Sequence, residues 1–423
     1  MPQLENLKAE PCEIVRRLVN NGHEAYLVGG AVRDLLLGVQ PKDYDIATSA
    51  SPEEVRSVFG RRQCRIIGRR FRLAHVIMNQ EIYEVSTFRR RPDEQERRGR
   101  QSDDGTMIWS DNEFGTLEED AARRDFTVNS LYYDVCGKRG IIDFAGGLKD
   151  LKKRVVRALG DPAERFDEDP VRMIRALKLC GQYQFTLARD LAKALKEKRP
   201  KLILASRSRL FEELLKILSS SKSEAILAVL HKHDILSLLW PVFNQSWDEA
   251  EGLLARQLMI LRGRELEAGH IHLSKAMALA TACLPFLMSA LNPRNMTAFW
   301  KRDENTDELA GKVIRLVFEE YALPKFFAMR IRDICYLVPR LLAKPVSPRA
   351  FQHQEYRHAR KLLEMLIETY HWDADILDDL PQAVYPMLID SNSKQADDAA
   401  ADSRKRPGRR RPHRRQKTPP ASA

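Results

Sequence analysis

The sequence predicts an α+β protein in which a small mixed-sheet head is followed by an all-helical remainder. Short apolar runs separated by glycine-containing turns fill roughly the first 150 residues, a pattern typical of a compact sheet with helices. From Pro162 to roughly Leu380, apolar residues recur at helical spacing with few strand signals. The 423 residues are 43% apolar, so the chain can form two or three domains with real cores.

Composition excludes several classes of protein. No apolar run reaches membrane-spanning length, and the N-terminus lacks the basic-then-apolar pattern of a secretory signal. The six cysteines are scattered without a Cys-x-x-Cys pair, which argues against a zinc site and against a disulfide framework. We therefore expect a cytoplasmic protein without a membrane partner, whose cysteines are reduced and mostly buried.

The net charge of +11 is concentrated near the C-terminus. Removing nine tail charges leaves about +2 for everything else. Such a tail can neutralise RNA phosphates without regard to sequence, and the absence of acids within it argues against a merely solubilising role. The nine residues are Arg404, Lys405, Arg406, Arg409, Arg410, Arg411, Arg414, Arg415 and Lys417.

The chain is organised around a strand, a glycine turn and a helix. A leading helix is predicted over residues 4–19, and the apolar run 25–28 predicts the first strand. Gly29 and Gly30 then form a tight turn, and a helical pattern begins near Val32. Adjacent glycines let main-chain N–H groups approach an anion, and the first N–H groups of the helix add partial positive charge. The turn can therefore hold phosphate.

Residues 43–47 predict a second strand, with Asp43 and Asp45 on one side of it because strand side chains alternate. Two carboxylates beside a phosphate turn are what Mg²⁺ needs when it bridges protein and substrate phosphates. Each part alone has a simpler explanation, since a glycine pair is usually only a turn and an Asp-x-Asp is usually a solvated loop. Their combination in this order favours a functional site.

A helix and three strands come next. Ser51 is a predicted N-cap with Pro52 at the first helical position, and the helix runs to about Phe59. If the last two strands form a hairpin beside the Asp-x-Asp strand, Glu84 supplies a third carboxylate; the alternative is an exposed strand glutamate. The predicted strands cover residues 65–67, 73–78 and 82–86, with a turn at 79–80.

A polar, charged stretch from Arg89 to Asp120 predicts a long loop. After it, Arg124, Asp125 and Asn129 fall at helical offsets that place Asp125 and Asn129 on one face. Beside a nucleotide, these residues would supply a cation for the triphosphate and oxygen acceptors for the ribose hydroxyls. The alternative is a charged surface helix.

The remaining signals mark the change to helices. Residues 141–151 predict a strand, a glycine turn and a connector. Residues 167–177 predict a helix start with acids in the first turn and Pro170 at an early position, and the helical pattern continues over 211–218. From about Asp390 the composition predicts a disordered tail.

Five blocks spread over residues 20–220 resemble the motifs of class II nucleotidyltransferases, the family that contains bacterial poly(A) polymerases and tRNA CCA-adding enzymes. They are the Gly-Gly-x-x-Arg-Asp turn, Asp43-x-Asp45, the segment Arg124 to Asn129, the connector from Asp143 to Arg157, and Glu168-Asp169-x-x-Arg172. The resemblance implies a nucleotidyltransferase head over residues 1–150, a helical neck with a base-recognition motif over 151–220, a helical RNA-binding body over 221–389 and a disordered Arg-rich tail over 390–423.

The same resemblance implies roles for single residues. Asp43 and Asp45 would bind two Mg²⁺ ions, assisted by Glu84. ATP and RNA 3′ ends are the implied substrates, and RNA-decay or RNA-chaperone proteins are candidate partners. The residues implied to contact the nucleotide are Gly29, Gly30, Arg33, Arg124, Asp125, Asn129, Asp169 and Arg172.

Asp169 and Arg172 are three residues apart, so on one helix they would share a face. A carboxylate accepts from an exocyclic amine and a guanidinium donates to a ring nitrogen, a pattern that adenine and cytosine both satisfy. Guanine and uracil would leave groups unpaired, at about 1–3 kcal/mol each. The motif predicts A and C over G and U, but does not separate A from C.

The run from Ile66 to Val76 resembles a segment that marks bacterial poly(A) polymerases off from their CCA-adding relatives, and the basic tail points the same way. We therefore expect template-independent poly(A) addition. The alternatives are CCA addition to tRNA from CTP and ATP, and an RNA-binding protein whose transfer site has decayed. The intact Asp43, Asp45 and Glu84 argue against decay.

One departure from the family pattern lies in the neck. Lys178 stands where a third arginine is common, and Leu179 replaces a frequent Phe. A lysine cannot reproduce a planar bidentate contact, so the positioning of the base is affected rather than the chemistry. The run 206–214 resembles a further family motif, which we interpret as a brace for the neck.

Overall fold

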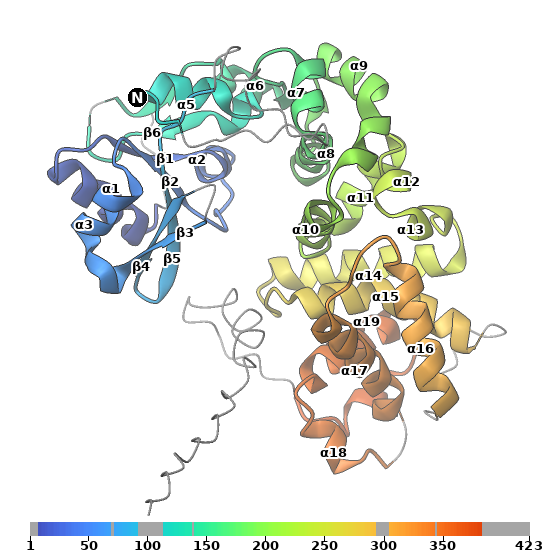
Figure 1. Ribbon diagram of the computed structural model, residues 1–423. Helices are drawn as coiled ribbons and strands as arrows, with labels where there is room; N and C mark the ends of the chain where they lie inside the picture. Colours follow the sequence, from blue (N-terminus) through green and yellow to red (C-terminus); the bar gives the residue numbers. More distant parts are fainter. Residues whose placement is uncertain are drawn as a thin grey trace, which may run out of the picture.

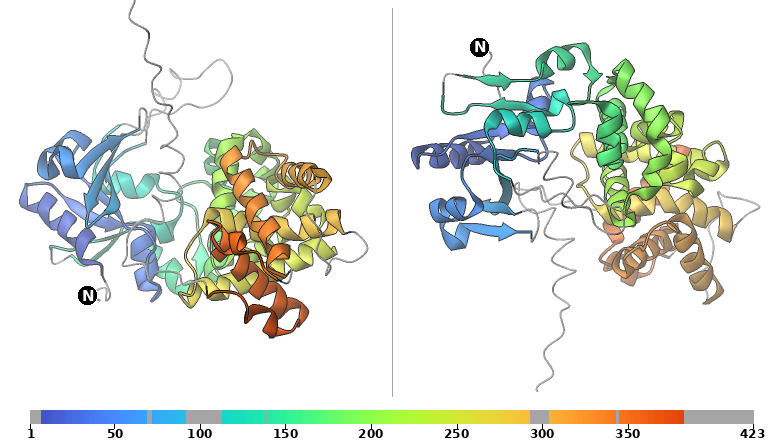
Figure 2. Two further views of the ribbon diagram at one scale, coloured as in Figure 1. Left: turned by 90° about the horizontal axis from the view of Figure 1, so that it is seen from below. Right: turned by 45° about the horizontal axis from the view of Figure 1, so that its top comes forward.

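The computed structural model describes residues 7–68, 72–91, 113–137, 139–292, 304–342 and 345–382. A sheet with its helices forms one limb of an arc, and helices form nearly all of the rest (Figure 1). Figure 2 shows these two parts side by side from two further directions. The predicted α+β architecture is confirmed. The basic tail and most of the predicted loop between Arg89 and Asp120 lie outside the described residues, and the domain boundaries stay a prediction.

The head sheet has the strand order β3-β4-β5-β2-β1-β6-β7. Its central strand β2 runs parallel to β5 and antiparallel to β1, so the sheet is mixed. Strands β4 and β5 form the predicted antiparallel hairpin. The strands are β1 (Ala25–Val28), β2 (Asp45–Thr48), β3 (Cys64–Ile67), β4 (Leu73–Met78), β5 (Glu81–Thr87), β6 (Leu131–Tyr133) and β7 (Ile141–Asp143).

The register of the central strand places the glycine turn beside the aspartates. Val28, the last residue of β1, pairs with Asp45, the first residue of β2. On the other side of β2, Asp45 pairs with Glu84 of β5. The hairpin therefore lies directly beside the Asp-x-Asp strand, which was the condition for Glu84 to reach the site.

Helices pack around this sheet, and local sequence explains where several of them begin. Ser51 and Glu54 form a reciprocal capping box at the start of α3, with Pro52 at its first position. Thr116 and Glu119 cap α5 in the same way. The head helices are α1 (Ala9–Asn20), α2 (Gly30–Leu36), α3 (Pro52–Gln63), α5 (Leu117–Arg123), the 3-10 turn η1 (Thr127–Asn129) and α6 (Gly147–Lys153).

Helices continue the chain beyond the head. They are α7 (Pro162–Glu168), α8 (Val171–Tyr183), α9 (Arg189–Lys198), η2 (Arg199–Leu204), α10 (Arg207–Leu218), α11 (Ser223–Lys232), α12 (Leu236–Leu239), α13 (Pro241–Gln245), α14 (Ala250–Glu267), α15 (Lys275–Leu291), α16 (Glu304–Val317), α17 (Lys325–Leu342), α18 (Pro348–Phe351), α19 (Tyr356–Tyr370) and η3 (Ala374–Leu377). None of the described helices is long and apolar enough to cross a membrane. Every cysteine except Cys136 is buried, as expected.

Three local expectations were wrong. The remainder is not wholly helical, because β9 (Thr186–Leu187) pairs in parallel with β8 (Val155–Val156); two-residue strands are too short to show periodicity. The loop predicted as far as Asp120 ends earlier, because α5 begins at Leu117 and runs to Arg123. The helix predicted over 167–177 is two helices, broken between Glu168 and Val171, because the residue before Pro170 is disfavoured from helical geometry.

Gly29 caps α2 with a φ of 73° and a ψ of −126°, a conformation that strains any residue with a Cβ. We expect Gly29→Ala to lower the free energy of unfolding by about 1–3 kcal/mol, measured by urea denaturation. Gly30→Ala is the matched control, because the nearest atom to a Cβ there, on Arg33, is 3.6 Å away and its backbone is helical. The control should change stability by less than about 1 kcal/mol. Equal losses in the two variants would contradict this account of the turn.

Candidate active site

Two exposed carboxylates stand at the start of the central strand. Asp43 and Asp45 are exposed, whereas Tyr44 between them and Ile46 after them are buried in the head core. The alternation directs both carboxylates to the solvent side of the strand, as predicted. Asp43 itself lies just before β2 rather than within it.

Glu84 lies next to Asp45 across the parallel β2–β5 ladder. Its side chain is 52% exposed, and its Oε1 is 3.6 Å from Nε2 of His75 on β4. Glu84 does not complete a three-ligand metal site, because the described residues contain no group of three or more His, Cys, Asp or Glu side chains placed to hold a metal ion. The candidate metal ligands are therefore Asp43 and Asp45. Two carboxylates suit Mg²⁺, which takes one or two from the protein and completes its coordination shell with substrate phosphates and water.

Arg124 places a cation against the glycine turn. Its Nη1 lies 3.4 Å from the point where a Cβ on Gly29 would stand. The guanidinium is held by Tyr132, whose hydroxyl accepts from Nε at 2.9 Å, and by Asp120, whose Oδ2 accepts from Nη2 at 3.0 Å. Although burial opposes its ionisation, the charges of Arg124 and Arg123 lower the pKa of Asp120. Arg124 is therefore fixed with one edge toward the turn.

Arg33 is buried and engaged within the protein. Its Nη1 donates to Oδ1 of Asn129 at 2.5 Å, and its Nε and Nη2 donate to Asp34 at 2.9 and 2.7 Å. Nη2 also donates to the hydroxyl of Tyr183, the last residue of α8, at 2.8 Å. That hydroxyl donates in turn to Asp34 at 2.7 Å. The residue expected to face a triphosphate thus belongs to a network that joins α2 to the neck.

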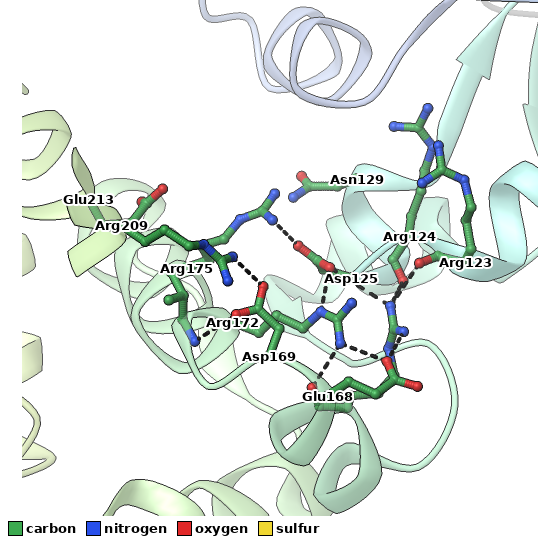
Figure 3. A network of polar contacts seen from close by, with 12 residues as sticks. Arg123, Arg124, Asp125, Asn129, Glu168, Asp169, Arg172, Arg175, Arg209 and Glu213 are labelled. Carbon is green, nitrogen blue, oxygen red and sulfur yellow. Dashed lines mark hydrogen bonds and ion pairs between the residues drawn. The ribbon is translucent and has the colours of Figure 1, made fainter. Parts of the chain in front are cut away.

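Asp125 and Asn129 do not share a helical face, which corrects the expectation from their spacing. Helix α5 ends at Arg123, and Asp125 lies between it and η1. Asn129 turns toward Arg33. Asp125 turns instead to the neck helix α8, where its Oδ1 accepts from Nε of Arg172 at 2.8 Å and its Oδ2 pairs with Arg175 (Figure 3).

The arginines control the ionisation of Asp125. Its side chain is only 11% exposed, and burial alone would raise its pKa. The charges of Arg175 and Arg172 more than offset that effect, and the pKa of Asp125 is lowered.

A further buried arginine, Arg165 of α7, donates to the carbonyl oxygens of Arg123 and Arg124 at 2.7 and 2.8 Å. The neck therefore holds the segment after α5 from two helices.

Asp169 and Arg172 are not on one helix, so the prediction that they share a helical face was wrong. Asp169 is an extended residue between α7 and α8, and its Oδ2 accepts from Nη2 of Arg209 at 2.7 Å. Arg172 instead donates to Asp125 and, through Nη1, to Glu168 at 2.8 Å. Within the described residues Nη2 of Arg172 makes no hydrogen bond. Figure 3 shows the two side chains in one polar network, each with its own partner.

Comparisons with known proteins identify the family. The model described as "Poly A polymerase head domain" matches residues 25–157, and the one described as "Probable RNA and SrmB- binding site of polymerase A" matches residues 184–246. The "Poly(A) polymerase I" of Haemophilus influenzae is 36% identical over 368 residues, which cover 84% of this chain and 79% of that protein. The chain belongs to the class II nucleotidyltransferases.

Relatives of both branches are present. A "CCA-adding enzyme" of Bacillus licheniformis is 38% identical over 216 residues, which cover 50% of this chain and 51% of that protein. The crystal structure of the Bacillus stearothermophilus CCA-adding enzyme in complex with CTP matches with a TM-score of 0.58 and 25% identity, covering 88% of this chain and 82% of that one. This nucleotidyltransferase is therefore an enzyme of the group that adds nucleotides to RNA 3′ ends.

Sequence reasoning missed the residues that orient the nucleotidyltransferase site. Asp120 could have been found, because it is four residues before Arg124 on α5, at the spacing of a helical ion pair. Tyr183 carries no such signal, since 150 positions separate it from Arg33. At Lys178, where an arginine is common in the family, burial lowers the pKa of the lysine to about 8 against the opposing charge of Glu213. A lysine also lacks the planar fork through which an arginine makes bidentate contacts.

Asp125→Asn tests the joint between head and neck. It leaves Arg172 and Arg175 facing a neutral amide, so we expect a loss of about 1.5–3 kcal/mol in the free energy of unfolding at pH 7. Because the folded-state pKa is lowered, this contribution is complete above the unfolded pKa of about 4 and disappears as pH falls through the folded value. Denaturant titrations from pH 7 downward measure it.

The control is Asp234→Asn, which removes an ion pair with Arg199 whose aspartate side chain is 65% exposed. That variant should lose less than about 1 kcal/mol. A loss from Asp125→Asn that stays constant down to the acid limit would contradict the role of the two arginines.

Tyr183→Phe tests whether the neck positions Arg33. The ring stays beneath the guanidinium, 4.6 Å away, while the hydroxyl contacts to Arg33 and Asp34 disappear. We expect nucleoside triphosphate affinity to fall about fivefold, the equivalent of one hydrogen bond, with little change in melting temperature. Tyr370→Phe in α19 is the control. Equal triphosphate affinities in wild type and Tyr183→Phe would refute the positioning role.

Proposed function

We propose that the chain is a template-independent poly(A) polymerase, which transfers AMP from ATP to an RNA 3′-hydroxyl and releases pyrophosphate. The observation that carries this proposal is the extent of similarity. In sequence, the poly(A) polymerase I match spans 84% of the chain and continues into the helical body, whereas the CCA-adding sequence match spans 50%. The run from Ile66 to Val76 and the basic tail support the same choice.

In this proposal Asp43 and Asp45 hold two Mg²⁺ ions, and Glu84 adds negative charge one strand away. Bound there, the ions would lower the pKa of the attacking hydroxyl and stabilise charge on the leaving pyrophosphate. The main-chain N–H of Gly30, at the start of α2, takes a phosphate oxygen, and Arg124 stands beside the turn; the N–H of Gly29 donates instead to the carbonyl of Leu131 at 3.0 Å. Asp43, Asp45 and Arg124 would thus place two carboxylates and a cation around the same glycine turn.

The remaining contacts belong to Arg33, Asp125, Asn129, Asp169 and Arg172. Beyond its bonds to Asn129, Asp34 and Tyr183, Arg33 keeps one N–H of Nη1 for the triphosphate, and Asn129 keeps its side-chain NH₂ group for the ribose. Nη2 of Arg172 can donate to a ring nitrogen without breaking its bonds to Asp125 and Glu168. Asp169 accepts an exocyclic amine beside its bond to Arg209. These contacts select A and C over G and U.

A direct incorporation assay separates the two products. Purified protein is incubated with ATP or CTP and either an unstructured RNA or a tRNA lacking its CCA end. We expect long tracts on unstructured RNA with ATP alone. Extension of the tRNA that needs CTP and stops after three nucleotides would establish the CCA-adding alternative and refute the proposal.

Asp43→Ala and Asp45→Ala test the metal assignment. Replacing a residue that only supports a metal ligand typically lowers metal affinity or activity by about 10–100-fold. Replacing a ligand itself should therefore reduce turnover by more than about 100-fold. RNA binding, followed by filter retention, should be unchanged. The control is Asp248→Ala, an exposed aspartate of the helical body. Substantial turnover in either variant would refute the assignment, and RNA retention by wild type without any ATP incorporation would revive the decayed-site alternative.

A further inference from the structure

A hollow of about 500 Å³ lies where the head meets the neck. Its sides are the paired strands β8 and β9, the end of α6 and the start of α9. Val155, Leu187 and Ala188 give it an apolar floor. None of the residues assigned to the nucleotide site lines it. The remaining lining residues are Lys153, Arg157, Arg189 and Asp190.

The charge of this hollow is positive and only partly compensated. Asp190 accepts the N–H of its neighbour Leu191 at 2.9 Å, and Arg157 donates to the buried Asp150 at 3.0 Å. Lys153 and Arg189 are exposed and make no ion pair or side-chain hydrogen bond within the described residues. Two cations therefore face the hollow with their donors available.

The position of Arg189 has an electrostatic cost. It is the first residue of α9, where the helix dipole disfavours a positive side chain. Exposed Lys152 and Arg154 adjoin Lys153 and add repulsion on the facing wall. Because these side chains are exposed, water screens most of this repulsion, and a bound anion would remove what remains.

The hollow is connected to the nucleotide site through the backbone. The N–H of Thr127 donates to the carbonyl of Arg157 at 3.0 Å, and its hydroxyl donates to Asp150 at 2.8 Å. Thr127 opens η1, whose last residue Asn129 bonds Arg33. The hollow therefore lies directly behind the segment that carries Asp125 and Asn129.

Chemistry of the lining indicates the kind of ligand. Separated cations above an aliphatic floor suit a chain of phosphates whose riboses and bases need apolar contact. The β9 and α9 wall falls within residues 184–246, the part matched by the family model described as a probable RNA-binding site. A strand of RNA fits both observations better than a single small anion.

We propose that this hollow binds backbone phosphates of single-stranded RNA upstream of its 3′ end, through Lys153 and Arg189. The proposal rests on the proposed function, since it needs RNA as the substrate. The hollow then holds the RNA strand while nucleotides are added to its 3′ end at Asp43 and Asp45.

The test is a double variant, Lys153→Gln with Arg189→Gln, in the full chain. RNA affinity is measured against salt concentration for oligoadenylates of increasing length. Each phosphate contact to a single strand contributes about 0.7 to the slope of log affinity against log salt, so the magnitude of the slope should fall by about 1.4 for long oligomers. It should not change for oligomers too short to reach the hollow. The KM for ATP and kcat on a short primer should equal those of wild type.

Arg61→Gln with Arg62→Gln is the matched control, because it removes two exposed cations from the end of α3. This pair should leave the length dependence intact. The same salt slope in the double variant and wild type would overturn the proposal. The proposal would also be overturned if the double variant lost binding of inorganic tripolyphosphate but kept the wild-type salt dependence of RNA affinity. The hollow would then be a small-anion site. Failure of wild type to incorporate ATP would refute the proposed function while leaving the salt slopes to decide the hollow.

Discussion

The site depends on the hydrogen-bond register of one central strand. With Val28 opposite Asp45 and Glu84 on its other side, β2 presents its carboxylates beside the glycine turn and buries Tyr44 and Ile46. A slip of one residue would exchange the two faces, placing aspartates in the apolar core and an aromatic ring in solvent. Because that exchange would bury charge and expose apolar surface, the core itself enforces the geometry that the proposed metal and phosphate site requires.

The neck helix α8 touches the head at both of its ends, and this makes the neck part of the site. Near its start, Arg172 and Arg175 hold Asp125; at its end, Tyr183 holds Arg33 and Asp34. Head and neck are therefore joined through residues that we propose contact the nucleotide. A nucleotide that competes for Arg172 or Arg33 must also act on this joint, so binding and the placement of the two parts are coupled.

Sequence predicted what is encoded within a few residues. The strand, glycine turn and helix from Ala25, the capped α3 and the β4–β5 hairpin all have their signals within one or two turns of chain. The helix break at Asp169 was not predicted, although a residue before proline disfavours helical geometry. The acids that precede the apolar run were interpreted as the first turn of a helix. The partners of Asp125, Asp169 and Arg33 come from positions 40 to 150 residues away, where only the folded chain brings them together.

Diffraction from crystals soaked with Mn²⁺ and a non-hydrolysable ATP analogue tests the central claim most directly. The account predicts anomalous density bonded to the carboxylates of Asp43 and Asp45, at about the 2.0–2.2 Å typical of such small divalent cations, with the triphosphate running over Gly29 and Gly30. Metal and triphosphate found elsewhere, with both aspartates uncoordinated, would contradict it.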